Sequence, residues 1–190
     1  MKKIYRIIAY TVVLFSLMFS VCRKNQAESE EDRISRIKAD YRSRIRTEYV
    51  IEKSASSRED AVRKFLESIS LLKTGAEPDF YCSEKEYKEI FLPNTVDENT
   101  LTSFMNAEEA WKITKIRRDL AFTDMNALLK GKNFTIKEFI WSEKQRELHS
   151  LKGHVLKKVI LQSGKDEIEI DSVRLVIEHR NQFKVCVVAK

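Results

Sequence analysis

Residues 155–170 read VLKKVILQSGKDEIEI, and this stretch decides the fold. Its first half is apolar on both faces, which predicts a central strand, and the SGKD of residues 163–166 has the composition of a hairpin turn. Ile168 and Ile170 then lie on one side of a returning strand. Because strands joined by so short a connection pair antiparallel, we predict a hairpin at the centre of the C-terminal half.

The strand pattern continues to the C-terminus with one change of phase. Apolar residues alternate on one side of the chain before Asp171 and on the opposite side after Ser172. A strand cannot change faces without an extra residue, so we predict a bulge or bend at this pair. A turn at residues 180–181 separates the last predicted strand, residues 183–187, from the one before it. With a further strand over residues 134–141, these segments indicate a bent antiparallel sheet.

The segment before the strands has helical periodicity instead. Residues 54–73 carry a broad apolar face, with Ser56 or Ser57 as the N-cap and acidic residues in the first turn. The TG of residues 74–75 is expected to end this helix. The SEKE of residues 83–86 is a capping box that opens a short helix.

A long helix is predicted over residues 107–130, with Gly131 as its cap. Its apolar residues recur at helical spacing and are expected on one side: Ala110, Trp111, Ile113, Ile116, Leu120, Ala121, Met125, Leu128 and Leu129. Basic residues form the other side: Lys112, Lys115, Arg117 and Arg118. We interpret the basic side as a solvated face, and contact with acidic lipid headgroups is the alternative.

Helices followed by antiparallel strands predict an α+β fold, in which N-terminal helices pack on a bent antiparallel sheet formed by the C-terminal strands. The AVRKFL of residues 61–66 and the long terminal strands are similar to those of the nuclear transport factor 2-like superfamily. That resemblance would cover roughly residues 56–190, and it implies a cone-shaped domain. Cystatin-like and other folds that pack helices on a sheet stay open.

The first residues have the layout of an export signal. Residues 1–6 carry three basic residues and no acidic one, and residues 7–21 carry no charge. A basic start followed by an apolar run is typical of a secretory signal peptide. A spanning helix usually needs about 20 apolar residues, and this run ends sooner, at Arg23 and Lys24. We therefore predict a signal peptide over residues 1–21.

Cys22 follows the apolar run directly, in the LMFSVC of residues 17–22. This stretch resembles the lipobox of bacterial lipoproteins, in the relaxed form found in spirochaetes. Ser20 fits the common pattern, whereas Phe19 stands in place of Leu and Val21 in place of Gly, Ala or Ser. The resemblance implies cleavage before Cys22 and acylation of its thiol, with more than one acyl chain, as stable anchoring requires. The alternatives are a simple signal peptide and an uncleaved signal anchor in the inner membrane.

Residues 22–55 are dense in charge. A narrow helical stripe of apolar residues recurs through them at intervals of three and four: Ile34, Ile37, Tyr41 and Ile45. We interpret the segment as a charged, partly helical tether that carries the lipidated cysteine and precedes a single α+β domain over residues 56–190. A charged helix that docks on that domain or on a partner is the alternative.

The charge of the chain gives no indication of a nucleic-acid partner. The formal net charge of +6 falls to +3 without residues 1–21, because these hold three basic residues and no acidic one. Nucleic-acid binding usually shows as a clustered basic face, and so small an excess does not predict one. A hydrophobic content of 43% with four Gly and two Pro indicates a folded body.

Cys82 and Cys186 remain once Cys22 is assigned to the anchor. In an exported chain they could pair in a disulfide, which would close a long loop. The alternative is two buried free thiols. Sequence alone leaves both open, because a disulfide depends on the distance between the two Cα atoms.

The remaining candidates for chemistry are weak. His149, His154 and His179 lack the spacing of a zinc motif. His149 and His154 lie five residues apart, and we interpret these two as polar surface groups, with a metal site as the alternative. Three acidic residues alternate on one strand face, and a solvated sheet face or cross-strand pairing with Lys157 explains them better than a bound cation: Glu167, Glu169 and Asp171. We expect no catalytic residue, no metal site and no cofactor.

These features predict a protein of the cell envelope, anchored to a membrane through lipid on Cys22 and facing the periplasm or the surface. We interpret its domain as a non-enzymatic module that binds an envelope protein or has a structural role. The alternative is a small-molecule-binding or enzymatic domain of the cone fold. Such a domain would bring polar groups together in an apolar cavity.

Overall fold

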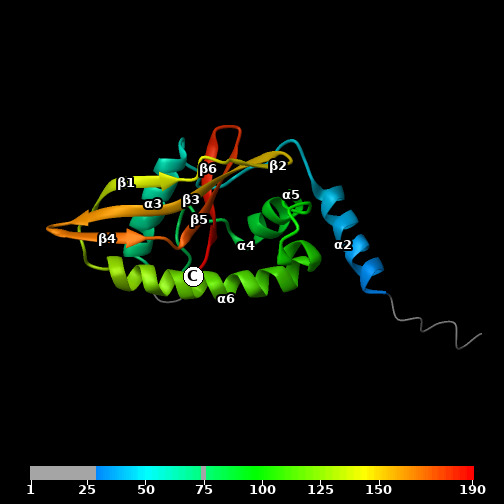
Figure 1. Ribbon diagram of the computed structural model, residues 1–190, viewed down its shortest axis with the longest axis horizontal. Coiled ribbons are helices and arrows are strands. Elements are labelled where there is room, and N and C mark those ends of the chain that lie inside the picture. Colours follow the sequence, from blue (N-terminus) through cyan, green and yellow to red (C-terminus); the bar gives the residue numbers. More distant parts are fainter. Residues whose placement is uncertain (1–28, 74–75) are drawn as a thin grey trace, which may run out of the picture. The chain divides into compact units, whose positions relative to one another are not determined.

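The computed structural model describes residues 29–73 and 76–190 (Figure 1). The chain divides into a first unit, Met1–Ser35, and a compact unit, Arg36–Lys190. The predicted signal peptide and Cys22 lie outside the described residues. Among the residues that are described, no helix has both the length and the apolar character needed to cross a membrane.

Helices come first in the chain and strands follow. The helices are α2 (Glu30–Arg44), α3 (Arg58–Ser70), α4 (Glu84–Glu86), η2 (Tyr87–Phe91), α5 (Leu92–Asn94), η3 (Leu101–Phe104) and α6 (Ala107–Leu129). The strands are β1 (Thr135–Trp141), β2 (Arg146–Leu148), β3 (Leu151–Ser163), β4 (Asp166–Ile170), β5 (Val173–His179) and β6 (Gln182–Val188). The predicted α+β class is confirmed: helices pack against a six-stranded antiparallel sheet that is not closed.

The long strand β3 is the centre of the sheet. Along one edge it pairs with β1 and β2, and along the other with β4 and β5. β6 pairs with the outer edge of β5. The predicted hairpin is the β3–β4 connection, and Gly164 in its turn has a φ of 60°, in the left-handed region that glycine adopts without strain.

The predicted bulge lies between β4 and β5. Val159 of β3 pairs with Ile170 of β4, and Val155 of β3 pairs with Leu175 of β5. The step is therefore four residues along β3 and five along its partner, which leaves one extra residue at Asp171 and Ser172. The extra residue moves the apolar side chains of β5 to the opposite parity, as their sequence pattern requires.

Two apolar cores lie on opposite faces of the sheet. Val176 and Val185 belong to the first core, with α3 and the C-terminal part of α6, whereas Leu175 and Cys186 belong to the second, with η2 and the N-terminal part of α6. α6 therefore contacts both cores and joins them. Its buried apolar side chains are Ala110 and Trp111 in the second core, and Ala121, Phe122, Met125 and Leu129 in the first.

The helix signals in the sequence are reproduced at residue level. Ser57 is the N-cap of α3, and its Oγ accepts a hydrogen bond from the Asp60 N–H at 3.1 Å. In the capping box of α4, the Glu86 N–H donates to Ser83 Oγ at 3.2 Å and the Ser83 N–H donates to Glu86 Oε2 at 2.8 Å. The residues expected to end α3, at 74–75, lie outside the described part of the chain.

The compact unit begins at Arg36, earlier than the boundary predicted at residue 56. Tyr41 is buried in the second core, and its hydroxyl donates to the Met105 carbonyl at 2.9 Å. Further along, Ala55 exchanges two backbone hydrogen bonds with Phe183. The narrow apolar stripe is therefore sufficient to dock the charged helix, so from Arg36 onward the docked-helix alternative describes the segment better than a tether does.

The outer edge of β6 is covered by segments that are not strands. Ala55 and Phe183 exchange N–H to O bonds of 2.8 and 2.9 Å. The Cys82 N–H donates to the Val185 carbonyl at 2.8 Å, and the Val185 N–H donates to the Phe80 carbonyl at 3.1 Å. These bonds satisfy backbone groups that an open edge would present to other chains.

A buried ion pair joins β6 to α4 and to the segment before α3. Lys184 Nζ lies 2.9 and 2.7 Å from the two carboxylate oxygens of Glu86, and it also donates to the Glu52 carbonyl at 2.6 Å. Only 4% of the Lys184 side chain and 9% of the Glu86 side chain are exposed. The Glu52 N–H donates to the same carboxylate at 3.1 Å. Lys184 thus uses its donors on protein oxygens, and both carboxylate oxygens accept from protein N–H groups.

Removal of one partner of this pair should strongly destabilise the fold. In Lys184→Met the Glu86 carboxylate stays buried without its counter-charge, so we expect the free energy of unfolding to fall by about 3–5 kcal/mol. The double variant Lys184→Met/Glu86→Gln should be more stable than the single one, because no uncompensated charge remains. Urea unfolding followed by circular dichroism measures both.

The matched control for this prediction is Lys137→Met. Lys137 pairs with Glu167 at 2.6 Å, but both side chains are at least half exposed. Exposed pairs contribute little to stability, so the unfolding free energy of this variant should remain close to that of wild type. A cost of Lys184→Met no greater than that of Lys137→Met would contradict the structural role of the buried pair.

Candidate binding surface

The structure joins Cys82 and Cys186 in a disulfide, with their Cα atoms 4.8 Å apart. Both residues are fully buried in the second core. The pairing that the sequence left open is therefore formed, and it connects the segment before α4 to β6. A disulfide of this kind is consistent with folding outside the cytoplasm.

Loss of this disulfide should lower stability without changing the fold. The two cysteines are 104 residues apart in the sequence, so their bond strongly constrains the unfolded chain. We expect the Cys82→Ala/Cys186→Ala variant to lose about 3–5 kcal/mol of unfolding free energy. Denaturant unfolding of the variant and of the oxidised wild type tests this, with reduced wild type as the control. Equal unfolding free energies for the variant, the oxidised wild type and the reduced wild type would show that the disulfide does not stabilise the fold.

The three histidines engage separate partners and do not converge. His149 Nε2 lies 3.0 Å from Asp97, and His154 Nε2 lies 2.7 Å from Glu178. His179 is buried: its Nδ1 lies 3.1 Å from the Ser150 carbonyl and its Nε2 accepts from the Tyr49 N–H at 3.2 Å. His179 is therefore a core group. Of the two histidines predicted to be surface groups, the His149 side chain is 36% exposed, but the His154 side chain is only 10% exposed. In the part of the chain that the structure describes, no group of His, Cys, Asp or Glu is placed to hold a metal ion.

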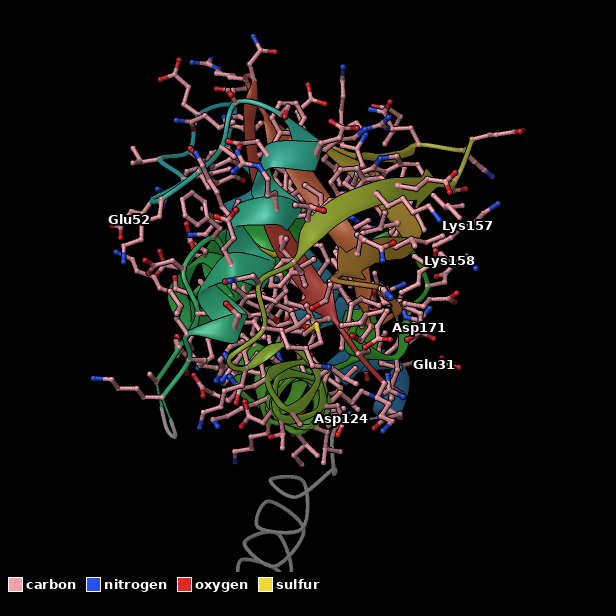
Figure 2. The ribbon with its side chains drawn as sticks, turned by 90° about the vertical axis from the view of Figure 1, so that its left-hand side faces the viewer. Glu31, Glu52, Asp124, Lys157, Lys158 and Asp171 are labelled. Atoms are coloured by element: carbon pink, nitrogen blue, oxygen red, sulfur yellow. A yellow bond between two sulfur atoms is a disulfide. The ribbon has the colours of Figure 1, made fainter. Side chains whose placement is uncertain are left out.

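The acidic stripe on β4 is used in cross-strand ion pairs. Glu167 pairs with Lys137 of β1 at 2.6 Å, and Glu169 pairs with Lys158 of β3 at 2.8 Å. The expected partner, Lys157, lies next to Lys158 on β3 (Figure 2) but makes neither pair. In the pairing of β4 with β3, Glu167 lies opposite Gln162 and Glu169 lies opposite Ile160, positions that share the parity of Lys158 and not that of Lys157.

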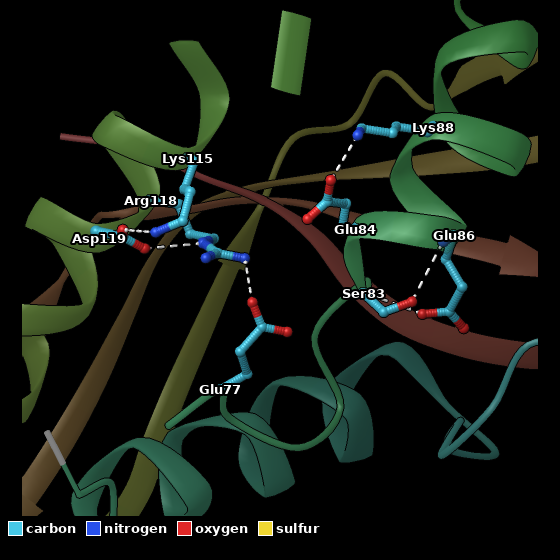
Figure 3. Close-up of polar contacts among 8 residues, drawn as sticks. All are labelled: Glu77, Ser83, Glu84, Glu86, Lys88, Lys115, Arg118 and Asp119. Carbon is cyan, nitrogen blue, oxygen red and sulfur yellow. Dashed lines mark hydrogen bonds and ion pairs between the residues drawn. The ribbon is translucent and has the colours of Figure 1, made fainter. Parts of the chain in front are cut away.

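Arg118 is not on the solvated side of α6, where the sequence pattern places it. Only 3% of its side chain is exposed, and its guanidinium lies 4.7 Å from the ring centre of Trp111 and 5.4 Å from that of Phe122. Nη1 donates to Glu77 and Nε to Asp119, both at 3.0 Å (Figure 3). Aromatic rings therefore pack on the planar cation while carboxylates satisfy its edge.

The contacts of Arg118 affect the titration of its neighbours. Burial acts to raise the pKa of Asp119, but hydrogen bonds from Lys115 and Arg118 outweigh it, so the pKa lies below its usual value. Tyr81 also packs beside Arg118, with the guanidinium 5.7 Å from its ring centre. Burial raises the pKa of Tyr81, whose hydroxyl has no hydrogen-bond partner among the described residues. Arg118 therefore contacts residues of both cores: Trp111 of the second core, and Phe122 and Tyr81 of the first.

We expect that lysine cannot replace Arg118 without a loss of stability. Its ammonium group is compact and cannot stack on two rings while it donates to two carboxylates. We expect Arg118→Lys to lower the free energy of unfolding by about 1–3 kcal/mol, close to the cost of Arg118→Met. The adjacent Arg117→Lys, at an exposed position, should remain within about 0.5 kcal/mol of wild type. Full stability of Arg118→Lys in thermal or urea unfolding would show that charge alone is sufficient.

The side of α6 that faces away from the cores is unexpectedly apolar. Ile116 is 64% exposed and Leu120 is 58% exposed. At 100° per residue, both lie about 160° around the helix axis from the buried Arg118. The spacing predicts one apolar side, but exposed apolar residues also lie opposite the buried side. We call this second face the outer stripe; it consists of the apolar Ile113, Ile116, Leu120 and Ala127, with Thr123 between them.

A hollow of about 220 Å³ lies beside the outer stripe, between η2, η3, α6 and the end of β6. Its lining includes Phe91, Leu101, Ile113 and Val187, with Arg117 at its polar side. Pockets for drug-sized ligands usually measure about 300–1,000 Å³, so this hollow suits side chains of a partner better than a separate small molecule. The outer stripe and the hollow together form the candidate binding surface.

Comparisons with family models, with curated proteins and with solved structures find no match to this chain. The class that the fold defines is an α+β domain with a buried disulfide.

Proposed function

We propose that this chain is an exported lipoprotein of the bacterial cell envelope, whose compact unit is a protein-binding module. The buried Cys82–Cys186 disulfide is the observation that carries the export part of the proposal. The lipid anchor rests on the sequence of residues 1–22, where a basic start and an uncharged run end at Cys22. The resemblance to spirochaetal lipoproteins supports the same assignment.

The outer stripe supports the binding part of the proposal. Ile116 and Leu120 are exposed together on one helix face, next to an apolar hollow and to the cationic Arg117. Contiguous apolar surface rimmed by polar groups usually marks an interaction site. A small-molecule-binding or enzymatic role for the domain stays the alternative, because hollows of about 420 Å³, along α6 and the end of β4, and of about 400 Å³, beside α4, have the volume of ligand pockets. The resemblance to the cone-shaped fold stays a prediction.

Mass spectrometry of the N-terminus tests the anchor directly. The full chain is expressed in a bacterial host and extracted from its membranes with detergent. We expect the mature N-terminal residue to be an acylated Cys22, with residues 1–21 removed. An intact Met1 would assign the chain to the signal-anchored class instead, and a free thiol on a cleaved chain would indicate a simple signal peptide.

Two variants make this test specific. Cys22→Ala should lose acylation and leave the membrane fraction; a variant that stays fully membrane-bound would count against the lipid anchor. Phe19→Leu/Val21→Ala restores the common lipobox pattern and should be acylated at least as completely as wild type. Loss of acylation in this second variant would contradict the assignment of residues 17–22 as a lipobox.

A further inference from the structure

The outer stripe of α6 has the spacing of a helix-pairing surface. Its members follow one another at alternating intervals of three and four residues, from Ile113 to Ala127. This is the a and d spacing of a heptad repeat, which keeps one seam facing a partner helix. In Figure 1 the sheet, α3, α4 and α5 lie on one side of α6, and the outer stripe is on the side away from the cores. The helix is therefore apolar on two sides, although only one contacts a core.

The charges beside the stripe indicate which partner fits. With Ile113 and Leu120 as a positions, Arg117 and Asp124 are both e positions, and Lys112 and Asp119 are both g positions. If a second copy of α6 packs antiparallel with Leu120 at the centre, Arg117 of each copy lies opposite Asp124 of the other. The helix is thus complementary to itself, and the two-fold symmetry forms this ion pair twice.

Parallel packing of the same helix would be opposed by its charges. In a parallel pair, g positions face e positions of the other helix five residues further on. Lys112 would then face Arg117, and Asp119 would face Asp124, so both contacts would join like charges. In the antiparallel arrangement Asp119 approaches its own copy, but its charge is already compensated by Lys115 at 2.5 Å and Arg118 at 3.0 Å.

We propose that two copies of this chain associate through α6, with the helices antiparallel and the two-fold axis beside Leu120. The contact from Ile113 to Ala127 is about 22 Å long, at 1.5 Å per residue. A single helix pair of this length is smaller than a standard interface, so the dimer is weak, with a dissociation constant on the order of micromolar. The association does not depend on acylation of Cys22.

Cysteine cross-linking of the full chain in membranes tests the arrangement. In an antiparallel pair, residue 120 faces its own copy, so Leu120→Cys should form a covalent dimer on mild oxidation. Residue 113 lies about 20 Å from its own copy, at 1.5 Å per residue, and Ile113→Cys should therefore stay monomeric. Ile113→Cys mixed with Ala127→Cys should give a heterodimer. Non-reducing electrophoresis separates the products.

Two controls establish the background of this experiment. Val50→Cys introduces a thiol at a site that is 83% exposed and lines a hollow to which α6 contributes no residue. The wild type serves as the second control, because any covalent dimer that it forms would show the amount of cross-linking through Cys22. Dimer formation by Leu120→Cys no greater than by Val50→Cys would overturn the proposal, and so would cross-linking to a different protein. Efficient self-cross-linking of Ile113→Cys would show parallel packing and overturn the antiparallel arrangement.

Charge reversal gives an independent measure. Arg117→Glu and Asp124→Lys should each weaken the dimer by roughly 3- to 10-fold, and the double variant should recover most of the loss. Asp124 also pairs with Lys190 of its own chain, so Lys190→Ala is the control and should leave the dimer unchanged. Sedimentation velocity of the detergent-solubilised chain measures the fraction of dimer as a function of concentration. If the double variant is weaker than both single ones, the proposed pairing of Arg117 with Asp124 is wrong.

Discussion

The ion pair of Lys184 and Glu86 ties the compact unit together, because it buries more than nine-tenths of two oppositely charged side chains. Desolvation costs several kcal/mol per ion, and attraction offsets that cost only when hydrogen bonds satisfy the charged groups. Hydrogen bonds satisfy both charged groups here, and the groups that form them belong to β6, α4 and the segment before α3. Each of these segments must therefore be in place before the pair is stable. The flanking residues of β6 add to this junction: Phe183 and Val185 bond the edge segments, and Cys186 forms the disulfide.

Much of the fold follows from local patterns. Apolar parity alone located the bulge between β4 and β5, since a strand that is buried on one face cannot change faces otherwise. Ser57 and the pair of Ser83 and Glu86 marked helix starts through capping chemistry that depends on neighbours in the sequence. These features share one property, which is that the residues that decide them lie within a few positions of one another.

The features that sequence did not show are those decided between distant segments. Lys184 and Glu86 are 98 residues apart, and Glu86 is fully explained locally as part of a capping box. Arg118 lies among other basic residues, and only the positions of the aromatic rings show that its side chain is buried. For the candidate binding surface, the outer stripe was within reach of sequence reasoning. Its residues are apolar in the sequence, but the buried and exposed apolar sides of α6 both have helical spacing, so the pattern predicts a single side.

The two apolar sides of α6 connect the fold to the proposed function. The apolar face of a helix is normally the buried one, but in α6 Ile116 and Leu120 of the outer stripe are more than half exposed. A second copy of the same helix would cover the other side with matching charges. If lipid on Cys22 confines the chains to one membrane, their effective concentration rises, and a weak helix pair is sufficient for association. An anchor and a small self-complementary surface would then reinforce each other. They remain separable, because the stripe on α6 is present whether or not Cys22 carries lipid.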